Sequence, residues 1–229
     1  MIRPTRLTRI GVQIGGAIIV GTAAFLATSY TSLPWLLAVH FKTNGAANGW
    51  QYKTPARVLM PVFVQLALAL ILGGVGALLL SRRGERHEPN AADVRAAAAA
   101  AEGVVLMALI WVAFQSYAAF ALVRMWRSGR SGLGAGYVLL EILGIALTCI
   151  VGARANANLG RPEPDRDIPE HWRLGQLYCN AANPALFVPT RFGSRWTLNF
   201  GRPAAVVLLG GILAAGVAVP TLILVLTLR

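Results

Sequence analysis

Five apolar stretches of about 20 residues or more alternate with polar segments along this chain of 229 residues. The hydrocarbon core of a bilayer is roughly 30 Å thick, a distance that about 20 helical residues cover. We therefore predict an all-α integral membrane protein, a bundle of five transmembrane helices. The apolar stretches are residues 10–29, 57–80, 103–123, 133–153 and 204–228.

The flanks of these stretches refine the prediction. A basic segment precedes residue 10, as in a signal peptide, but the apolar part is longer than in a signal peptide and further spans follow. We predict an uncleaved transmembrane helix there. Six alanines at 96–101 precede the third stretch, and because alanine is the best helix former, we expect one long helix that starts outside the hydrocarbon. Pro61 falls in the first turn of the second helix, where proline is tolerated.

The polar segments divide the chain into four predicted units. Two pairs of helices come first, then a cytoplasmic module, then the last helix. The first pair encloses a structured extracellular loop at residues 30–56, in which Gly, Asn and Pro mark turns. The four units are residues 1–80, 81–153, 154–203 and 204–229.

Charge supports a membrane protein and indicates its orientation. Hydrophobic residues make up 56% of the chain and charged residues 13%, whereas a soluble domain carries about 25% charged residues. Of the 21 Lys and Arg, 14 lie on the side of the N-terminus and the module, and 7 lie on the opposite side. The positive-inside rule then places the N-terminus in the cytoplasm and the C-terminus outside a bacterial inner membrane. Because the arginines flank apolar runs, anionic lipid headgroups match the net charge of +12 better than nucleic acid does.

Residue patterns typical of enzyme active sites and metal sites are absent from this sequence. Cys149 and Cys179 provide neither a disulfide framework nor metal-ligand spacing. No G-x-S-x-G, H-E-x-x-H or phosphate-loop motif occurs. We therefore predict a non-enzymatic protein without a cofactor or a metal site.

One candidate site lies within the predicted membrane spans. Glu141 is in the fourth span, where a carboxylate is costly and faces a bundle interior or a water-filled path. Tyr137 precedes it by one turn, and Gln115 on the third span is its expected partner. These residues could form an ion, proton or headgroup site. The alternative, a protonated or hydrogen-bonded carboxyl that fixes helix packing, is favoured because no second intramembrane acid accompanies Glu141.

A second candidate site is the loop at residues 30–56. It offers a histidine, two asparagines, a tryptophan and a lysine close together in sequence. No Asp or Glu occurs before Glu85, so the loop supplies too few ligands for zinc. The alternative to a binding site is a folded cap whose tryptophan lies at the level of the lipid headgroups. The candidate binding residues are His40, Asn44, Asn48, Trp50 and Lys53.

The module at residues 154–203 mixes arginines with aromatic residues. β-Favouring residues on both sides of Phe192-Gly193-Ser194 predict a β-hairpin. Arginine among aromatics suits contact with anionic lipid, and we prefer this to stacking on nucleotide bases because a span follows at once. The alternating residues are Arg191, Arg195 and Arg202 with Phe187, Phe192, Trp196 and Phe200.

The loop resembles a known bacterial domain. The segment LPWLLAVHFKTNGAANGWQYK, residues 33–53, is similar to the DUF1648-type extracellular loop of SdpI-like immunity proteins, which protect bacteria from a secreted peptide toxin. Asn48 stands where that pattern commonly has Asp. The residues that carry the resemblance are Leu33, Pro34, His40, Phe41, Gly45, Asn48, Gly49, Trp50 and Lys53.

The module carries a second resemblance. Residues 171–203 are similar to a short DUF5808-type module of unknown function, with Asn183 in place of a usual Asp and Arg195 in place of a common Gly. Neither resemblance implies a reaction. The module residues that we single out on this basis are Trp172, Tyr178, Asn180, Arg191, Trp196 and Asn199.

These observations lead to three hypotheses for function. The first is a non-enzymatic inner-membrane protein of the immunity or envelope-stress type, whose loop senses or sequesters an extracellular peptide or a lipid headgroup. The second is a small transporter or channel subunit that uses Glu141. The third is a structural subunit that contacts a partner membrane protein, and Gly-rich helix faces are also compatible with a homo-oligomer.

Overall fold

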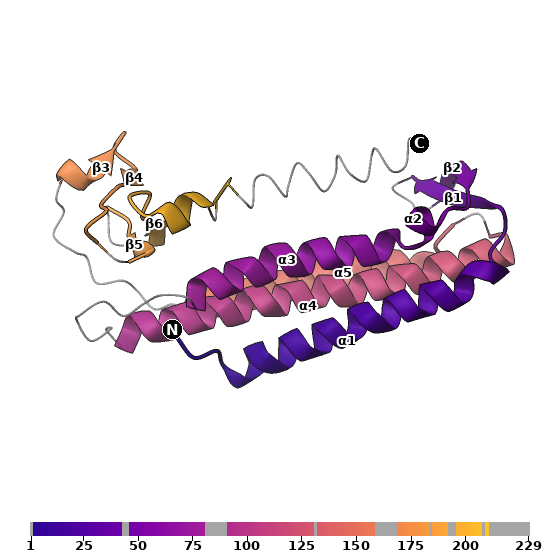
Figure 1. Ribbon diagram of the computed structural model, residues 1–229, viewed down its shortest axis with the longest axis horizontal. Helices are drawn as coiled ribbons and strands as arrows, with labels where there is room; N and C mark the ends of the chain where they lie inside the picture. Colours follow the sequence, from indigo (N-terminus) through magenta and orange to yellow (C-terminus); the bar gives the residue numbers. More distant parts are fainter. Residues whose placement is uncertain are drawn as a thin grey trace.

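Four long helices form the body of the protein (Figure 1). The computed structural model describes residues 2–42, 46–80, 91–130, 132–158, 169–183, 185–191, 196–207 and 209–210. All four helices are long and apolar enough to cross a membrane, as the sequence predicts. They are α1 (Arg6–Ser29), α3 (Met60–Leu80), α4 (Ala91–Ser128) and α5 (Ala135–Asn158).

The predicted fifth span is not tested. Residues 203–207 are helical, but residues 211–229 lie outside the described part of the chain. The third span is confirmed as one long helix, because α4 contains the whole alanine run and is 38 residues long in total. We therefore describe four candidate membrane helices.

The second apolar stretch begins differently from the prediction. A short helix, α2 (Pro55–Val58), has Thr54 as its N-cap, and the Thr54 hydroxyl accepts a hydrogen bond from the Arg57 backbone N–H. The chain leaves the helical conformation at Leu59 before α3 starts. Pro61 is the second residue of α3, so its missing N–H costs no helical hydrogen bond. The predicted helix 57–80 is thus split in two.

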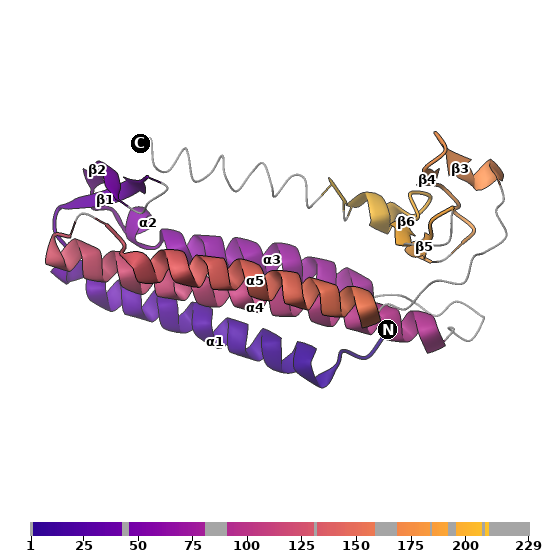
Figure 2. The same ribbon diagram turned by 180° about the vertical axis from the view of Figure 1, so that it is seen from behind.

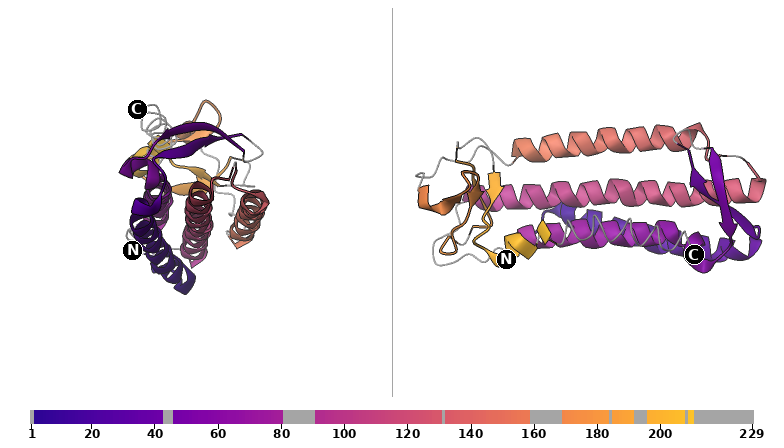
Figure 3. Two further views of the ribbon diagram at one scale, coloured as in Figure 1. Left: turned by 90° about the vertical axis from the view of Figure 1, so that its right-hand side faces the viewer. Right: turned by 90° about the horizontal axis from the view of Figure 1, so that it is seen from above.

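Helix α4 lies at the centre of the bundle. It packs against α1, α3 and α5, and α1 also contacts α3 (Figure 3). Small residues allow close approach at some of these crossings. A Cβ on Gly103 of α4 would lie only 2.7 Å from the Cβ of Ala155 on α5, whereas a Cβ on Gly76 of α3 would make an ordinary 3.5 Å contact with Val105.

The loop between α1 and α3 is a β-hairpin, which the sequence did not predict. A 3₁₀ turn, η1 (Tyr30–Ser32), leads into β1 (Leu36–Phe41), which pairs antiparallel with β2 (Ala47–Tyr52). Their register shifts on either side of His40, where the strands bulge. We call the end of the bundle that carries this hairpin the hairpin end.

The C-terminal module lies beyond the opposite end of the bundle (Figure 2). Its strands β5 (Phe187–Pro189) and β6 (Trp196–Leu198) pair antiparallel on either side of the predicted turn, which itself lies outside the described residues. A second pair was not predicted, and a bridge from Tyr178 to Asn199 joins the two hairpins. This pair is β3 (Trp172–Arg173) and β4 (Leu177–Tyr178), which follows the 3₁₀ turn η2 (Pro169–His171).

Candidate functional site

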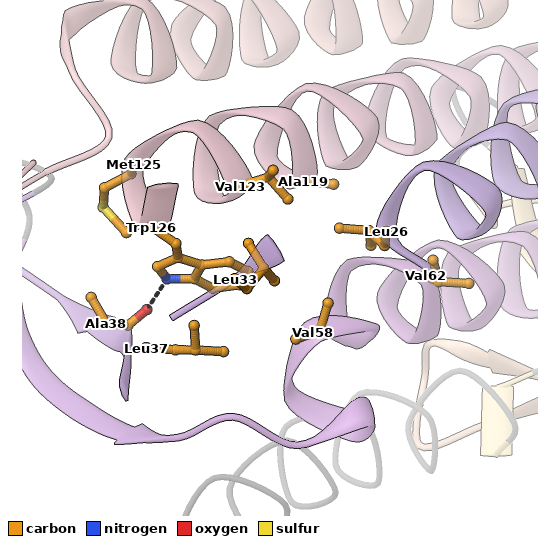
Figure 4. Close-up of a cluster of buried hydrophobic side chains, with 10 residues drawn as sticks. All are labelled: Leu26, Leu33, Leu37, Ala38, Val58, Val62, Ala119, Val123, Met125 and Trp126. Atoms are coloured by element: carbon orange, nitrogen blue, oxygen red, sulfur yellow. Dashed lines mark hydrogen bonds between the residues drawn. The ribbon is translucent and has the colours of Figure 1, made fainter. Parts of the chain in front are cut away.

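The β1–β2 hairpin is fixed to the helices by a buried apolar cluster at the hairpin end. The indole Nε1 of Trp126, near the end of α4, donates a hydrogen bond of 2.9 Å to the carbonyl oxygen of Ala38 (Figure 4). Trp126 is only 6% exposed, so this bond forms away from water, where it is strongest. The cluster consists of Leu26, Leu33, Leu37, Ala38, Val58, Val62, Ala119, Val123, Met125 and Trp126.

Two cations hold the base of the hairpin. The Lys53 ammonium donates to the carbonyl oxygens of Tyr30 (3.2 Å) and Leu33 (2.8 Å) and lies 4.9 Å from the centre of the Tyr30 ring. The guanidinium of Arg127 donates to the Ser32 hydroxyl at 2.6 and 3.0 Å. Lys53, a predicted binding residue, therefore connects β2 to the end of α1.

His40 packs against the opposite strand. Its cross-strand neighbour is Gly49, where a Cβ would lie 2.8 Å from the His40 ring, so glycine is required for this close approach. His40 is exposed, and the described residues contain no group of three His, Cys, Asp or Glu that could hold a metal. Asn44, also a predicted binding residue, lies outside the described part of the chain.

The outer face of the hairpin is aromatic. Trp50 is 56% exposed and Tyr52 is 63% exposed, and both alternate along β2 with half-buried residues. Trp35, just before β1, is 69% exposed and its ring centroid lies 6.1 Å from that of Tyr52. Asn48 is exposed on the same strand. The predicted residues Asn48 and Trp50 are thus available for contact, together with Trp35 and Tyr52, which the sequence did not single out.

A cavity of about 200 Å³ lies between the hairpin and the helices. Two of the predicted intramembrane residues, Gln115 and Tyr137, line it, whereas Glu141 does not. Arg57 also lines it; its Nη1 donates a 2.7 Å hydrogen bond to the carbonyl oxygen of Tyr52. The other lining residues are Ala38, Val39, Phe41, Met60, Pro61, Val64, Ala118, Leu122, Trp126 and Leu133.

Glu141 is half-buried on α5, away from this cavity. Around it, α5 packs on α4 through Tyr137, whose ring centroid lies 5.2 Å from that of Phe114, and through Thr148, whose hydroxyl accepts a 3.1 Å hydrogen bond from Trp111. These two contacts hold α5 against α4 on either side of Glu141 along the helix.

A buried polar contact among three helices was not predicted from the sequence. The Gln65 amide nitrogen on α3 donates to the Thr22 hydroxyl on α1 (3.1 Å) and to the Val112 carbonyl on α4 (2.8 Å). Ser116 on α4 lies within hydrogen-bonding distance of the same Thr22 hydroxyl, at 3.0 Å. The available signal was a single amide in the otherwise apolar run 57–80.

In the module, the predicted residue Asn199 joins several backbone segments. The side chain of Asn199 is completely buried, and its Nδ2 lies 2.8–3.1 Å from the carbonyl oxygens of Asn180, Asn183 and Ala185. Its Oδ1 accepts from the backbone N–H groups of Asn180 and Gly201, both at 3.0 Å. Asn199 is therefore a structural hub and not an exposed contact residue.

Three aromatic rings of the module pack together. Tyr178 is buried, and its ring centroid lies 5.3 Å from that of Trp172 and 5.7 Å from that of His171. Trp196 pairs with Pro189 through the strand register, and Arg191 is exposed just after β5. Of the predicted module residues, Arg191 is the one with an exposed side chain among those that the structure describes.

Comparison with known proteins identifies part of this module. Residues 182–206 match the model of a family of unknown function (DUF5808). The match includes the hub residue Asn199 and Gly201, where a Cβ would lie only 2.5–2.7 Å from backbone atoms of Asn180 and Ala181. No curated protein and no solved structure matches the chain. The match thus supports the resemblance of the C-terminal module over residues 182–206, while the loop at 33–53 has no such match.

Proposed function

We propose that this protein is a non-enzymatic bacterial inner-membrane protein of the immunity or envelope-stress type. In this proposal the hairpin end faces outward and senses or sequesters an extracellular peptide or a lipid headgroup. The observation that carries the proposal is an aromatic outer face on a hairpin that is fixed to the helices. The N-terminus and the module then lie in the cytoplasm, where the module contacts anionic lipid or a partner protein.

The exposed rings of Trp35, Trp50 and Tyr52 are suited to binding an amphiphilic molecule. Fully burying one large apolar side chain contributes about 1.5–3 kcal/mol, so three rings offer a substantial binding free energy. Tryptophan and tyrosine are enriched both at binding hot spots and at membrane interfaces. Because Trp126, Lys53 and Arg127 already hold the hairpin in place, little conformational entropy is lost when a molecule binds.

Charge at the hairpin end favours an anionic or zwitterionic binding partner. The two segments that meet there, residues 30–57 and 124–134, contain six cations and no Asp or Glu. Such an unbalanced patch attracts negative charge and raises the rate of encounter. The six cations are Lys42, Lys53, Arg57, Arg124, Arg127 and Arg130.

The proposal is tested by bacterial growth in the presence of envelope-active peptides. Cells that produce the protein should survive higher peptide concentrations than cells that do not. The double variant Trp50→Ser/Tyr52→Ser should lose this protection, because it removes two of the three exposed rings without touching the buried cluster. Leu174→Ser is the matched control, since Leu174 is an exposed apolar residue of the module.

The amount of each variant in the membrane fraction must be measured alongside growth. Full protection by the double variant, at wild-type abundance, would refute a role for the hairpin face. Loss of protection by the control as well would indicate that surface apolarity in general, and not this face, is responsible.

A further inference from the structure

The cavity beneath the hairpin has the size of one bulky side chain. A sphere of 200 Å³ is about 7 Å across. An engineered cavity of 150 Å³ already accepts benzene. A lipid tail, in contrast, extends through a leaflet whose hydrocarbon is roughly 15 Å thick, half of the bilayer core. The space therefore fits an aromatic ring or a branched aliphatic side chain and not a whole acyl chain.

Arg57 supplies a positive charge to this cavity. Its Nε–H is buried, and no group in the described part of the chain accepts a hydrogen bond from it. A guanidinium is always charged and presents its donors in a planar fork that matches a carboxylate. A ligand that carries a carboxylate therefore matches the charge of this lining.

The other polar groups of the lining are also suited to a ligand that carries a carboxylate. The Gln115 amide and the Tyr137 hydroxyl can each donate a hydrogen bond, and no carboxylate is among the lining residues. All remaining lining side chains are apolar. The cavity thus combines one cation and two neutral donors with an apolar wall.

We propose that this cavity receives the C-terminal residue of an extracellular peptide. The apolar side chain of that residue fills the cavity, and its terminal carboxylate pairs with the Arg57 guanidinium. This inference rests on the proposed function and names the part of the peptide that is recognised. Exposed rings on the hairpin then contact the preceding residues of the peptide, so that the two surfaces contribute to one binding event.

The test compares two forms of the same probe with the protein in lipid nanodiscs. The probes are N-acetyl-Gly-Ser-Gly-Ser-Phe as the free acid and as the C-terminal amide, which differ in charge and hardly in shape. Equilibrium dialysis should show that the acid binds at least about ten-fold more tightly than the amide. In Arg57→Gln this ratio should fall to about one, and Arg57→Lys should restore part of it because the charge returns without the fork.

Two further variants separate the cavity from general effects. Arg9→Gln removes an exposed cation on α1, outside the lining of the cavity and outside the hairpin end, and it should retain the ratio. Ala118→Leu fills the cavity from α4 and should weaken both forms of the probe equally. Because each ratio compares two probes on one protein, a partly destabilised variant still gives a valid result.

Several outcomes would overturn the inference. Equal affinity for acid and amide in the wild type, no measurable binding of either, or an unchanged ratio in Arg57→Gln would each do so. Decanoate that competes as strongly as the peptide acid would assign the cavity to a fatty acid instead. If the acid and the amide bind equally but Trp50→Ser/Tyr52→Ser loses protection, the proposed function stands and the cavity inference is rejected. If the acid binds more tightly but the double variant keeps protection, the role of the hairpin is rejected and the cavity remains a carboxylate site.

Discussion

The side-chain amide of Gln65 is completely buried among α1, α3 and α4, yet we expect that it can be removed at no cost. Its Nε2 makes two hydrogen bonds, and interhelical hydrogen bonds in membranes contribute about 0.6 kcal/mol each. Its Oε1 is buried and accepts no hydrogen bond in the described part of the chain, a situation that costs about 1–3 kcal/mol. The cost of the oxygen thus equals or exceeds the gain from the nitrogen.

Gln65→Leu removes both contributions while preserving most of the volume. Its free energy of unfolding should therefore lie between that of the wild type and a value about 2 kcal/mol higher. Gln65→Ala should instead lose about 2–5 kcal/mol, because it leaves a cavity between three helices. Thr22→Val deletes the shared hydroxyl and should cost about 1 kcal/mol.

Reversible unfolding in mixed micelles, with helix loss followed by circular dichroism as denaturing detergent increases, measures these differences. Leu70→Ala is the control, because Leu70 is 75% exposed on the same helix and its truncation leaves no cavity. The reasoning is refuted if Gln65→Leu destabilises the protein by as much as Gln65→Ala does. That result would mean that the hydrogen bonds of Nε2 outweigh the isolated Oε1.

Three other predictions follow from single contacts. Trp126→Phe leaves the buried carbonyl of Ala38 without its donor and should cost about 1–3 kcal/mol in the same unfolding assay, with faster proteolysis of the hairpin. Asn199→Ala removes the hub of the module, so the backbone N–H groups that it binds should lose their protection in hydrogen exchange while the helices keep theirs. Glu141→Gln should leave peptide protection unchanged, because Glu141 does not line the cavity; lost protection would favour the transporter hypothesis.

The helices were predictable because a bilayer imposes a length and a polarity that single residues cannot override. The alanine run before 103–123 correctly indicated a longer third helix. The break at Leu59 was not predicted, because it depends on the Thr54 cap, which the apolar pattern conceals. The β5–β6 hairpin was predictable from β-favouring residues on both sides of a Gly-containing turn.

The β1–β2 hairpin was not predicted because the usual pattern of buried apolar and exposed polar residues is reversed in β2. In β2 the aromatic residues point outward and small or polar residues are half-buried, so hydrophobic alternation does not mark the face toward the helices. The register shifts around His40 further disturb the period of two. The cavity was also inaccessible to sequence reasoning, since Phe41, Arg57 and Tyr137 are brought together from distant parts of the chain.

The residues that carry the two resemblances mostly support backbone and not contact with a ligand. Gly49 leaves room for His40, Lys53 joins β2 to the end of α1, and Asn199 binds five backbone groups. Side chains that support the backbone specify the shape of the loop or module. Proteins that bind different molecules can therefore share them. Recognition then depends on the side chains that are exposed on the hairpin or line the cavity. In this chain those are Trp50 and Tyr52 on the hairpin face and Arg57 in the cavity, which is why our experiments on peptide protection and carboxylate binding begin there.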